Sequence, residues 1–434
     1  MKNIIRFFFL VATFAFLVMP ACGNKNALTT HYLLNVRINP SSGGIECKIK
    51  IQHPPDSLFY LNQNLKIRRI TADGRTVSFH RKSFSKPLPY SVGTAVVVEA
   101  NAREELLVEY SGFLTEVINN VNMVNSDLVE LAYYAAWFPI FQGNNLFNFT
   151  LNADLPSDFI TTSNGILEHQ QQRQGRNITQ WASFKPDFDI VLLASPHLQK
   201  VGDDQKNTKV EMYFSKTPRE YIMTKKESLM KGMVQLTNFY GPPRVKGYLR
   251  FVYSPRSGWG YSRIPLFVVS EEYALKQQQE EFGQARDFHG ATHEMAHFWW
   301  NIADANTPDD WINEGLAEFS AFRLSEKFSG RDFTDQLVNE YREHAAHSVT
   351  ETSIVETETS SPDRYVNRYE KTTLLLIEAR RRFGSNELDG VLKALHTRFA
   401  GTRNATTGLF LEEVEKQLGI EAKSFFSEAL FSKK

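Results

Sequence analysis

Two histidines four residues apart give the strongest chemical signal in the sequence. His293-Glu294-Met295-Ala296-His297 has the form H-E-x-x-H. In an α-helix, residues i and i+4 lie about 40° apart around the axis, so both imidazoles can share one metal ion. Glu294 lies about 100° around from His293, where its carboxylate can act as a general base on water beside the metal. Eleven histidines in 434 residues would produce this pattern by chance in about a few of every hundred chains, so the pentapeptide alone is suggestive.

A third ligand is expected, because a catalytic zinc ion has three protein ligands and an open fourth position. Trp311-Ile312-Asn313-Glu314-Gly315 places a carboxylate early on the next predicted helix. Glu318 follows one turn later on the same face. Two histidines and one glutamate from two packed helices form a chemically reasonable zinc site.

These segments resemble the M1-type gluzincins, a zinc aminopeptidase family with thermolysin-like catalytic domains. In that family H-E-x-x-H precedes a W-L-N-E-G-type segment whose glutamate is the third ligand. The resemblance implies that His293, His297 and Glu314 hold one Zn²⁺ and that Glu294 is the catalytic base. The family also has a Tyr-Glu-Lys-Gly segment whose tyrosine stabilises the oxyanion. Tyr369-Glu370-Lys371-Thr372 stands in the same order here, which implies that role for Tyr369.

Simpler explanations exist for several neighbouring residues. Glu318 is predicted to orient a ligand histidine rather than to bind the metal, and a plain helix-face charge is the alternative. His289 is not expected to be a ligand, because a stripe of three turns is too long for one ion. For Tyr369 the alternative is a half-buried helix tyrosine. Trp299 and Trp300 are predicted to pack the histidine helix into the core.

The interval between the two zinc motifs departs from the family pattern. Sixteen residues separate His297 from Glu314, two fewer than is usual, and a short loop at Asn301–Asn306 would absorb the difference. Longer members also have a large helical domain that caps the site. Without such a cap, a more open cleft is expected here.

The exopeptidase segment departs more strongly. Gly260-Tyr261-Ser262-Arg263 stands where the family has G-x-M-E-N, whose glutamate binds the α-ammonium group of the substrate. Arg263 would repel that group, so recognition of a free amino terminus is in doubt. Gly260, Tyr261 and Arg263 stay candidate substrate contacts, and a plain salt bridge is the alternative for Arg263.

The elements that must position these residues form an α+β multidomain chain, as its length and patterning predict. Short apolar runs separated by turn clusters predict a β-sandwich-like N-terminal domain over 22–204. Helical spacing, two strand candidates and the two motif helices predict a catalytic domain over 205–385, which the resemblance makes thermolysin-like and mixed α/β. A short helical end of the catalytic core is expected over 386–434. The main expected strands and helices are His31–Asn39, Ala95–Ala100, Glu105–Tyr110, Phe147–Asn152, Ile190–Ala194, Thr217–Tyr240, Gly247–Tyr253, Arg263–Val269, Thr307–Ser329, Asn386–Phe399, Phe410–Leu418 and Glu421–Phe431.

The N-terminus predicts export. Lys2 and Arg6 precede an apolar run of 13 residues, Phe7–Met19, which is shorter than the approximately 20 residues that span a bilayer. Pro20-Ala21-Cys22 resembles the lipobox of bacterial lipoproteins. Residues 1–21 are therefore interpreted as a signal peptide, and Cys22 as a lipid anchor in the bacterial cell envelope, facing the periplasm or the outer surface. Ordinary secretion and an uncleaved anchor are the alternatives.

Composition limits the remaining functions. Forty-nine basic and 49 acidic residues cancel, so no nucleic-acid partner is expected. Two cysteines exclude a disulfide scaffold. The leading prediction is a zinc metallopeptidase acting on peptides or proteins. The alternatives are a catalytically weak surface lipoprotein that binds peptides on the same scaffold, and a zinc hydrolase for other substrates.

Overall fold

The structure is a computed structural model that describes residues 29–82, 91–101, 103–118, 120–143, 145–205, 208–349 and 351–433. The predicted signal peptide and Cys22 lie outside these residues. The N-terminal strands are β1 (His31–Asn39), β2 (Gly44–Gln52), β3 (Leu58–Asn62), β4 (Leu65–Ala72), β5 (Arg75–Thr76), β6 (Phe79–Lys82), β7 (Gly93–Val98), β8 (Leu106–Phe113), β9 (Met123–Val124), β10 (Val129–Leu131), β11 (Ile140–Phe141), β12 (Asn148–Pro156), β13 (Ile160–Ser163), β14 (Gly165–Arg173), β15 (Arg176–Ser183) and β16 (Leu192–Ser195).

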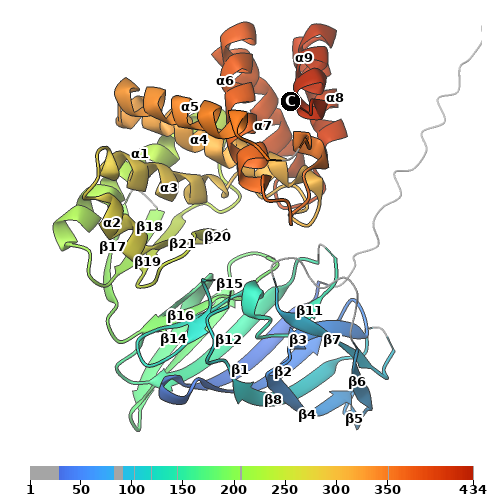
Figure 1. Cartoon of the computed structure of the whole chain (residues 1–434). Coiled ribbons are helices and arrows are strands. Elements are labelled where there is room, and N and C mark those ends of the chain that lie inside the picture. The colour runs from blue at the N-terminus through green and yellow to red at the C-terminus, as the bar shows by residue number, and fades with distance from the viewer. Residues whose placement is uncertain are drawn as a thin grey trace, which may run out of the picture.

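These strands form three sheets. The largest has the order β14-β15-β12-β1-β2-β8-β4-β5, and two four-stranded sheets have the orders β13-β16-β10-β9 and β11-β3-β7-β6. Strand β1 shows why the layers form: Tyr32, Leu34, Val36 and Ile38 are buried while the residues between them are more exposed. One apolar core joins residues from all three sheets. The expected β-sandwich-like N-terminal domain is confirmed (Figure 1).

A five-stranded mixed sheet begins the second half. Its strands are β17 (Gln199–Gln205), β18 (Thr208–Phe214), β19 (Tyr248–Ser254), β20 (Tyr261–Arg263) and β21 (Leu266–Ser270). The order is β17-β18-β19-β21-β20, with parallel pairs inside and antiparallel strands at both edges. Because β17 pairs with β18, this sheet starts at Gln199. Arg263, expected at the start of a strand, instead ends the short edge strand β20.

Helices fill the rest of the second half (Figure 1). They are α1 (Arg219–Tyr240), α2 (Glu271–Gln277), α3 (Gly283–Ala296), α4 (Trp311–Phe328), α5 (Arg331–Ala346), the π-helix η5 (Val366–Lys371), α6 (Thr372–Phe383), α7 (Ser385–Phe399), α8 (Thr407–Leu418) and α9 (Ile420–Phe431). A single apolar core runs from the five-stranded sheet through α1, α3 and α4 to α9, so the C-terminal helices belong to the same packed unit as the motif helices. Trp299 and Trp300 are buried in it, as predicted. Within the described ranges, no helix is both long and apolar enough to cross a bilayer.

Candidate active site

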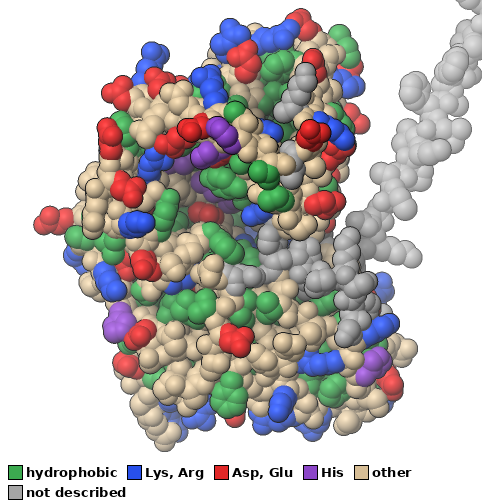
Figure 2. Space-filling model, in the orientation of Figure 1, with side chains coloured by type: hydrophobic (Ala, Val, Ile, Leu, Met, Phe, Trp, Pro, Cys, Tyr) green, Lys and Arg blue, Asp and Glu red, His purple; other side chains and the backbone are tan. Residues whose placement is uncertain are grey.

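The two sequence motifs meet in a large cavity. Helix α3 carries the first histidine and ends at the second, and α4 packs directly against it. A cavity of about 1180 Å³ lies over this pair and is lined by residues of both halves of the chain. Figure 2 shows the hollow between the helical part and the β part of the molecule. The N-terminal domain therefore supplies part of the cavity wall but none of the motif residues.

Three side chains converge at the centre of the cavity wall. Oε2 of Glu314 lies 3.4 Å from Nε2 of His293 and 3.3 Å from Nε2 of His297. Tetrahedral ligands at zinc–nitrogen and zinc–oxygen distances of 2.0–2.2 Å are separated by roughly 3.3 Å from one another. These three residues form the one group with metal-ligand spacing among the described His, Cys, Asp and Glu residues. The donor set and its spacing fit one zinc ion.

The Nδ1 atoms of His293 and His297 are both held by hydrogen-bond acceptors. His293 Nδ1 lies 2.6 Å from Oε2 of Glu318, and His297 Nδ1 lies 3.0 Å from the carbonyl oxygen of Trp300. A carbonyl oxygen and an ionised carboxylate can only accept, so each Nδ1 carries a hydrogen and each Nε2 is the nitrogen left to bind a metal ion. This is the tautomer that a metal ligand requires.

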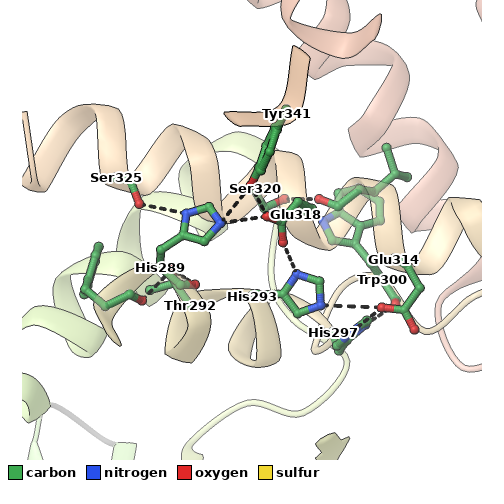
Figure 3. A network of polar contacts seen from close by, with 12 residues as sticks. His289, Thr292, His293, His297, Trp300, Glu314, Glu318, Ser320, Ser325 and Tyr341 are labelled. Atoms are coloured by element: carbon green, nitrogen blue, oxygen red, sulfur yellow. Dashed lines mark hydrogen bonds and ion pairs between the residues drawn. The ribbon is translucent and has the colours of Figure 1, made fainter. Parts of the chain in front are cut away.

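Glu318 forms the centre of a second, buried network (Figure 3). Its Oε1 accepts from Nε2 of His289 at 2.8 Å and from the hydroxyl of Tyr341. His289 Nδ1 lies 3.1 Å from the hydroxyl oxygen of Ser325. Burial raises the pKa of Glu318, but His289 and His293 outweigh it and hold that pKa well below its ordinary value. Glu318 thus stays a carboxylate that orients His293, and His289 supports Glu318 instead of approaching the ligand cluster.

A short loop and a close helix crossing position Glu314. Asn313 accepts the backbone N–H groups of Ile302 and Ala303 at 2.9 and 3.0 Å, which ties the start of α4 to the loop after α3. This direct tie accommodates the short interval between the motifs. At Gly315 a side chain would overlap Thr372 and lie 2.7 Å from the carbonyl oxygen of Arg368. Glycine lets η5 approach α4 closely and brings Tyr369 to the ligand cluster.

Glu294 lies on the opposite side of the cluster, against the edge strand. A Cβ atom at Gly260 would be 2.6 Å from Oε1 of Glu294, so the carboxylate rests against the glycine backbone. Burial raises the pKa of Glu294, an effect that the charges of His293 and His297 oppose. A raised carboxylate pKa brings the group closer to neutral pH, which suits a general base.

Tyr369 closes the site from η5. Its ring stacks on His293, with centroids 5.4 Å apart and an interplanar angle of 11°. Tyr365 stacks in turn on Tyr369 at 4.6 Å. Burial and the Glu314 carboxylate raise the pKa of the Tyr369 hydroxyl well above its ordinary value, so it remains a proton donor. The π-helical turn that presents this residue is a feature often found at functional sites.

The three candidate substrate contacts all line the cavity. Gly260 faces Glu294, whereas Tyr261 is buried in a small cluster between the edge strand and the N-terminal domain. Arg263 Nε lies 2.6 Å from Oδ2 of Asp189, so the salt bridge considered for this residue is present. Sequence reasoning missed the cavity-lining Tyr341, Phe188 and Arg403, which no motif marks.

Comparison by sequence finds neither a matching family model nor a matching curated protein. Comparison by structure finds similar proteins. The M1 zinc metallopeptidase from Deinococcus radiodurans matches with a TM-score of 0.72 and 14% identity over 93% of this chain and 94% of that one. A mutant of that enzyme bound to a Tyr-Ser-Ala substrate gives 0.73 and 15% over the same shares. Native yeast LTA4 hydrolase gives 0.69 and 14% over 92% of this chain and 67% of that one.

These likenesses establish the fold. The chain has the two-part architecture of the M1 zinc metallopeptidases, with a β-rich N-terminal part, a mixed α/β part and a helical end. The predicted α+β multidomain class is confirmed. The three candidate zinc ligands lie in the mixed α/β part, on α4 and at the end of α3, where the two sequence motifs stand.

Proposed function

We propose that this protein is a zinc-dependent metallopeptidase of the M1 type. The observation that carries the proposal is the ligand triangle of His293, His297 and Glu314, with edges of 3.3 and 3.4 Å to the glutamate and with both histidine tautomers fixed. Its neighbours support it: Glu294 on one side can accept a proton and Tyr369 on the other can donate a hydrogen bond. A module that only binds peptides has no need for either group.

The chemistry follows from the positions of these groups. Zinc held by the triangle would supply Lewis acidity, which lowers the pKa of water and polarises a carbonyl group. Glu294 accepts the proton of the attacking water and passes it to the leaving amine. The Tyr369 hydroxyl donates to the oxyanion that develops on the carbonyl oxygen. Glu318 and Trp300 keep both imidazoles in the ligand tautomer throughout.

Metal analysis combined with peptide cleavage tests the proposal. We expect one zinc ion per chain and hydrolysis of a mixed peptide library. Glu294→Gln should keep the zinc ion and lose most turnover, and Glu314→Gln should lose zinc. Full activity of Glu294→Gln would refute its role as base. Stoichiometric zinc without cleavage of any peptide would favour the alternative, a surface lipoprotein that binds peptides on this scaffold.

We also propose that the protein is exported and anchored in the bacterial cell envelope through a lipid on Cys22. The support is the basic start, the short apolar run and the lipobox-like segment of the sequence. Incorporation of labelled fatty acid into the wild type and not into Cys22→Ser tests the anchor. Release of the wild-type protein without any lipid would refute it.

A further inference from the structure

A glycine lies well inside the histidine helix α3, on the wall of the cavity. Gly290 is exposed and its backbone is helical, so no left-handed conformation requires glycine at this position. Glycine weakens the interior of a helix relative to alanine, because it loses more conformational freedom on folding. The reason for this glycine must therefore lie in the space around it.

No side chain approaches Gly290. A Cβ atom there would have no atom within 4 Å beyond the backbone of its own helix. At Gly232 on α1, by contrast, a Cβ atom would lie 3.2 Å from the side chains of Leu324 and Met295, so close packing explains that glycine. Among the glycines inside the described helices, Gly290 alone has no such neighbour. It therefore widens the cavity and does not serve the packing of the core.

The opening above Gly290 lies next to the reacting groups. Residues three and four apart share one face of a helix, so His293 and Glu294 lie on the same face, one turn after Gly290. Arg286 lies one turn before it. All four residues line the cavity. One helical turn rises about 5.4 Å, which places the opening within a side-chain length of the proposed general base.

Apolar and aromatic side chains surround this opening. Phe333 and Leu337 line the cavity from α5 and pack in one cluster, and the guanidinium carbon of Arg286 lies 5.9 Å from the centroid of the Phe333 ring. Tyr273 of α2 also lines the cavity and is 58% exposed. Burial raises the pKa of the Tyr273 hydroxyl and the charge of Arg286 opposes this, so Tyr273 lies near Arg286 at the same end of the cavity.

The charged groups at this end have partners. Arg286 donates to both carboxylate oxygens of Glu340, with Nη1 at 3.0 Å from Oε2. Asp287 pairs with a lysine of α1 at 2.8 Å. Nδ1 of His344 lies 2.8 Å from Oε1 of Glu370. An uncharged side chain therefore suits this part of the cavity better than a charged one.

We propose that Gly290 opens a subsite for a large apolar or aromatic side chain of the peptide, on the residue whose amine leaves. This inference rests on the proposed peptidase function. Glu294 passes its proton to the leaving amine, so the residue that carries this amine lies over α3, one turn from the opening. The carbonyl group of the other residue at the scissile bond faces Tyr369, on the opposite side of the ligand cluster.

Matched peptides test the subsite. One series has Phe, Leu or Ala on the leaving-amine side of the scissile bond, and a second series varies the acyl side in the same way. With the zinc-loaded wild type, we expect kcat/KM to be at least about tenfold higher for Phe than for Ala on the amine side, because burial of a large apolar side chain is worth about 10–100-fold. The same order is expected for binding to zinc-loaded Glu294→Gln, measured by calorimetry.

Variants test the glycine. Gly290→Leu fills the opening with a good helix former, and it should lower kcat/KM about 10–100-fold for the amine-side Phe peptide, with little change for the Ala peptide or the zinc content. Gly290→Ala should lower the Phe-to-Ala ratio in part while Tm rises or stays the same, and it decides the question if Gly290→Leu does not fold. Gly408→Leu is the matched control. Gly408 is an exposed helix glycine outside the cavity wall, where a Cβ atom would meet only Thr406, at 3.9 Å.

The outcomes separate the two proposals. Equal cleavage of the amine-side Phe and Ala peptides by the wild type overturns the inference while the peptidase function stands. An unchanged ratio in Gly290→Leu, or a loss confined to the acyl-side series, also overturns it. A lower Tm of Gly290→Ala would show that the fold itself needs this glycine and would overturn it too. If no peptide is cleaved, the proposed function fails, and equal binding of the Phe and Ala peptides to Glu294→Gln then overturns the inference separately.

Discussion

Replacement of Glu318 by glutamine should weaken zinc binding without unfolding the protein. The carboxylate accepts from His293 Nδ1 at 2.6 Å, from His289 Nε2 at 2.8 Å and from the Tyr341 hydroxyl. A glutamine side chain of nearly the same shape has one acceptor oxygen, and its NH₂ group must face at least one of these donors. His293 then loses the charge-assisted bond that holds its ligand tautomer.

The size of the effect follows from that bond. A hydrogen bond to a charged group contributes about 1.5–3 kcal/mol, and each 1.4 kcal/mol is a factor of about ten in an equilibrium constant. We therefore expect zinc affinity to fall by about 10–100-fold, which is the usual effect of removing a group that supports a metal ligand. Competition with a chromophoric chelator measures the affinity directly.

A control on the same helix makes the result specific. Glu326 on α4 pairs with Arg380 at the surface, at 2.8 Å. Glu326→Gln should leave zinc affinity unchanged, because exposed ion pairs contribute little and this one lies away from the ligand cluster. Wild-type zinc affinity in Glu318→Gln, in a protein with a normal thermal transition, would refute the reasoning.

Three further predictions concern the reaction itself. Tyr369→Phe should lower kcat by about 100-fold with little change in KM or zinc content, and an unchanged kcat in steady-state kinetics would exclude an oxyanion role. Burial raises the pKa of Glu294 above its ordinary 4.5, and only the ionised carboxylate accepts a proton. In the presence of excess zinc, kcat/KM should therefore fall with decreasing pH through a midpoint above 4.5. A midpoint at or below 4.5 would contradict this. In Gly260→Ala the new methyl group would meet Glu294 at about 2.6 Å, so activity should fall more than about tenfold while zinc is retained, and full activity would show that Glu294 does not need this contact.

The ligand triangle was predictable because the sequence motifs that indicate it are local. The spacing of His293 and His297 within one helix and the position of Glu314 at the start of the next are set by helix geometry. Strand β1 was predicted with the same bounds for a similar reason, since one alternating run decides which residues are buried.

The network behind the ligands depends on tertiary packing and gave little sequence signal. Helix α5 was not predicted, because only Phe333, Thr334, Leu337 and Tyr341 are buried in its 16 residues and charged residues separate them. Tyr341 reaches Glu318 only after α5 folds across α4. Strand β17 was also not predicted: it runs through Gly202, Asp203 and Asp204, and only its pairing with β18 makes this polar segment a strand.

The structure separates the candidate zinc ligands from the ion pair that joins the two parts of the chain. His293, His297, Glu314 and their supports come from α3, α4 and the loop between them, so metal affinity depends on the packing of two adjacent helices. The ion pair of Arg263 with Asp189 joins the edge strand β20 to the N-terminal part of the chain. A substitution that loosens this contact should therefore change kcat/KM for peptides before it changes zinc content, because Arg263 lines the cavity. Loosening α4 from α3 should do the reverse.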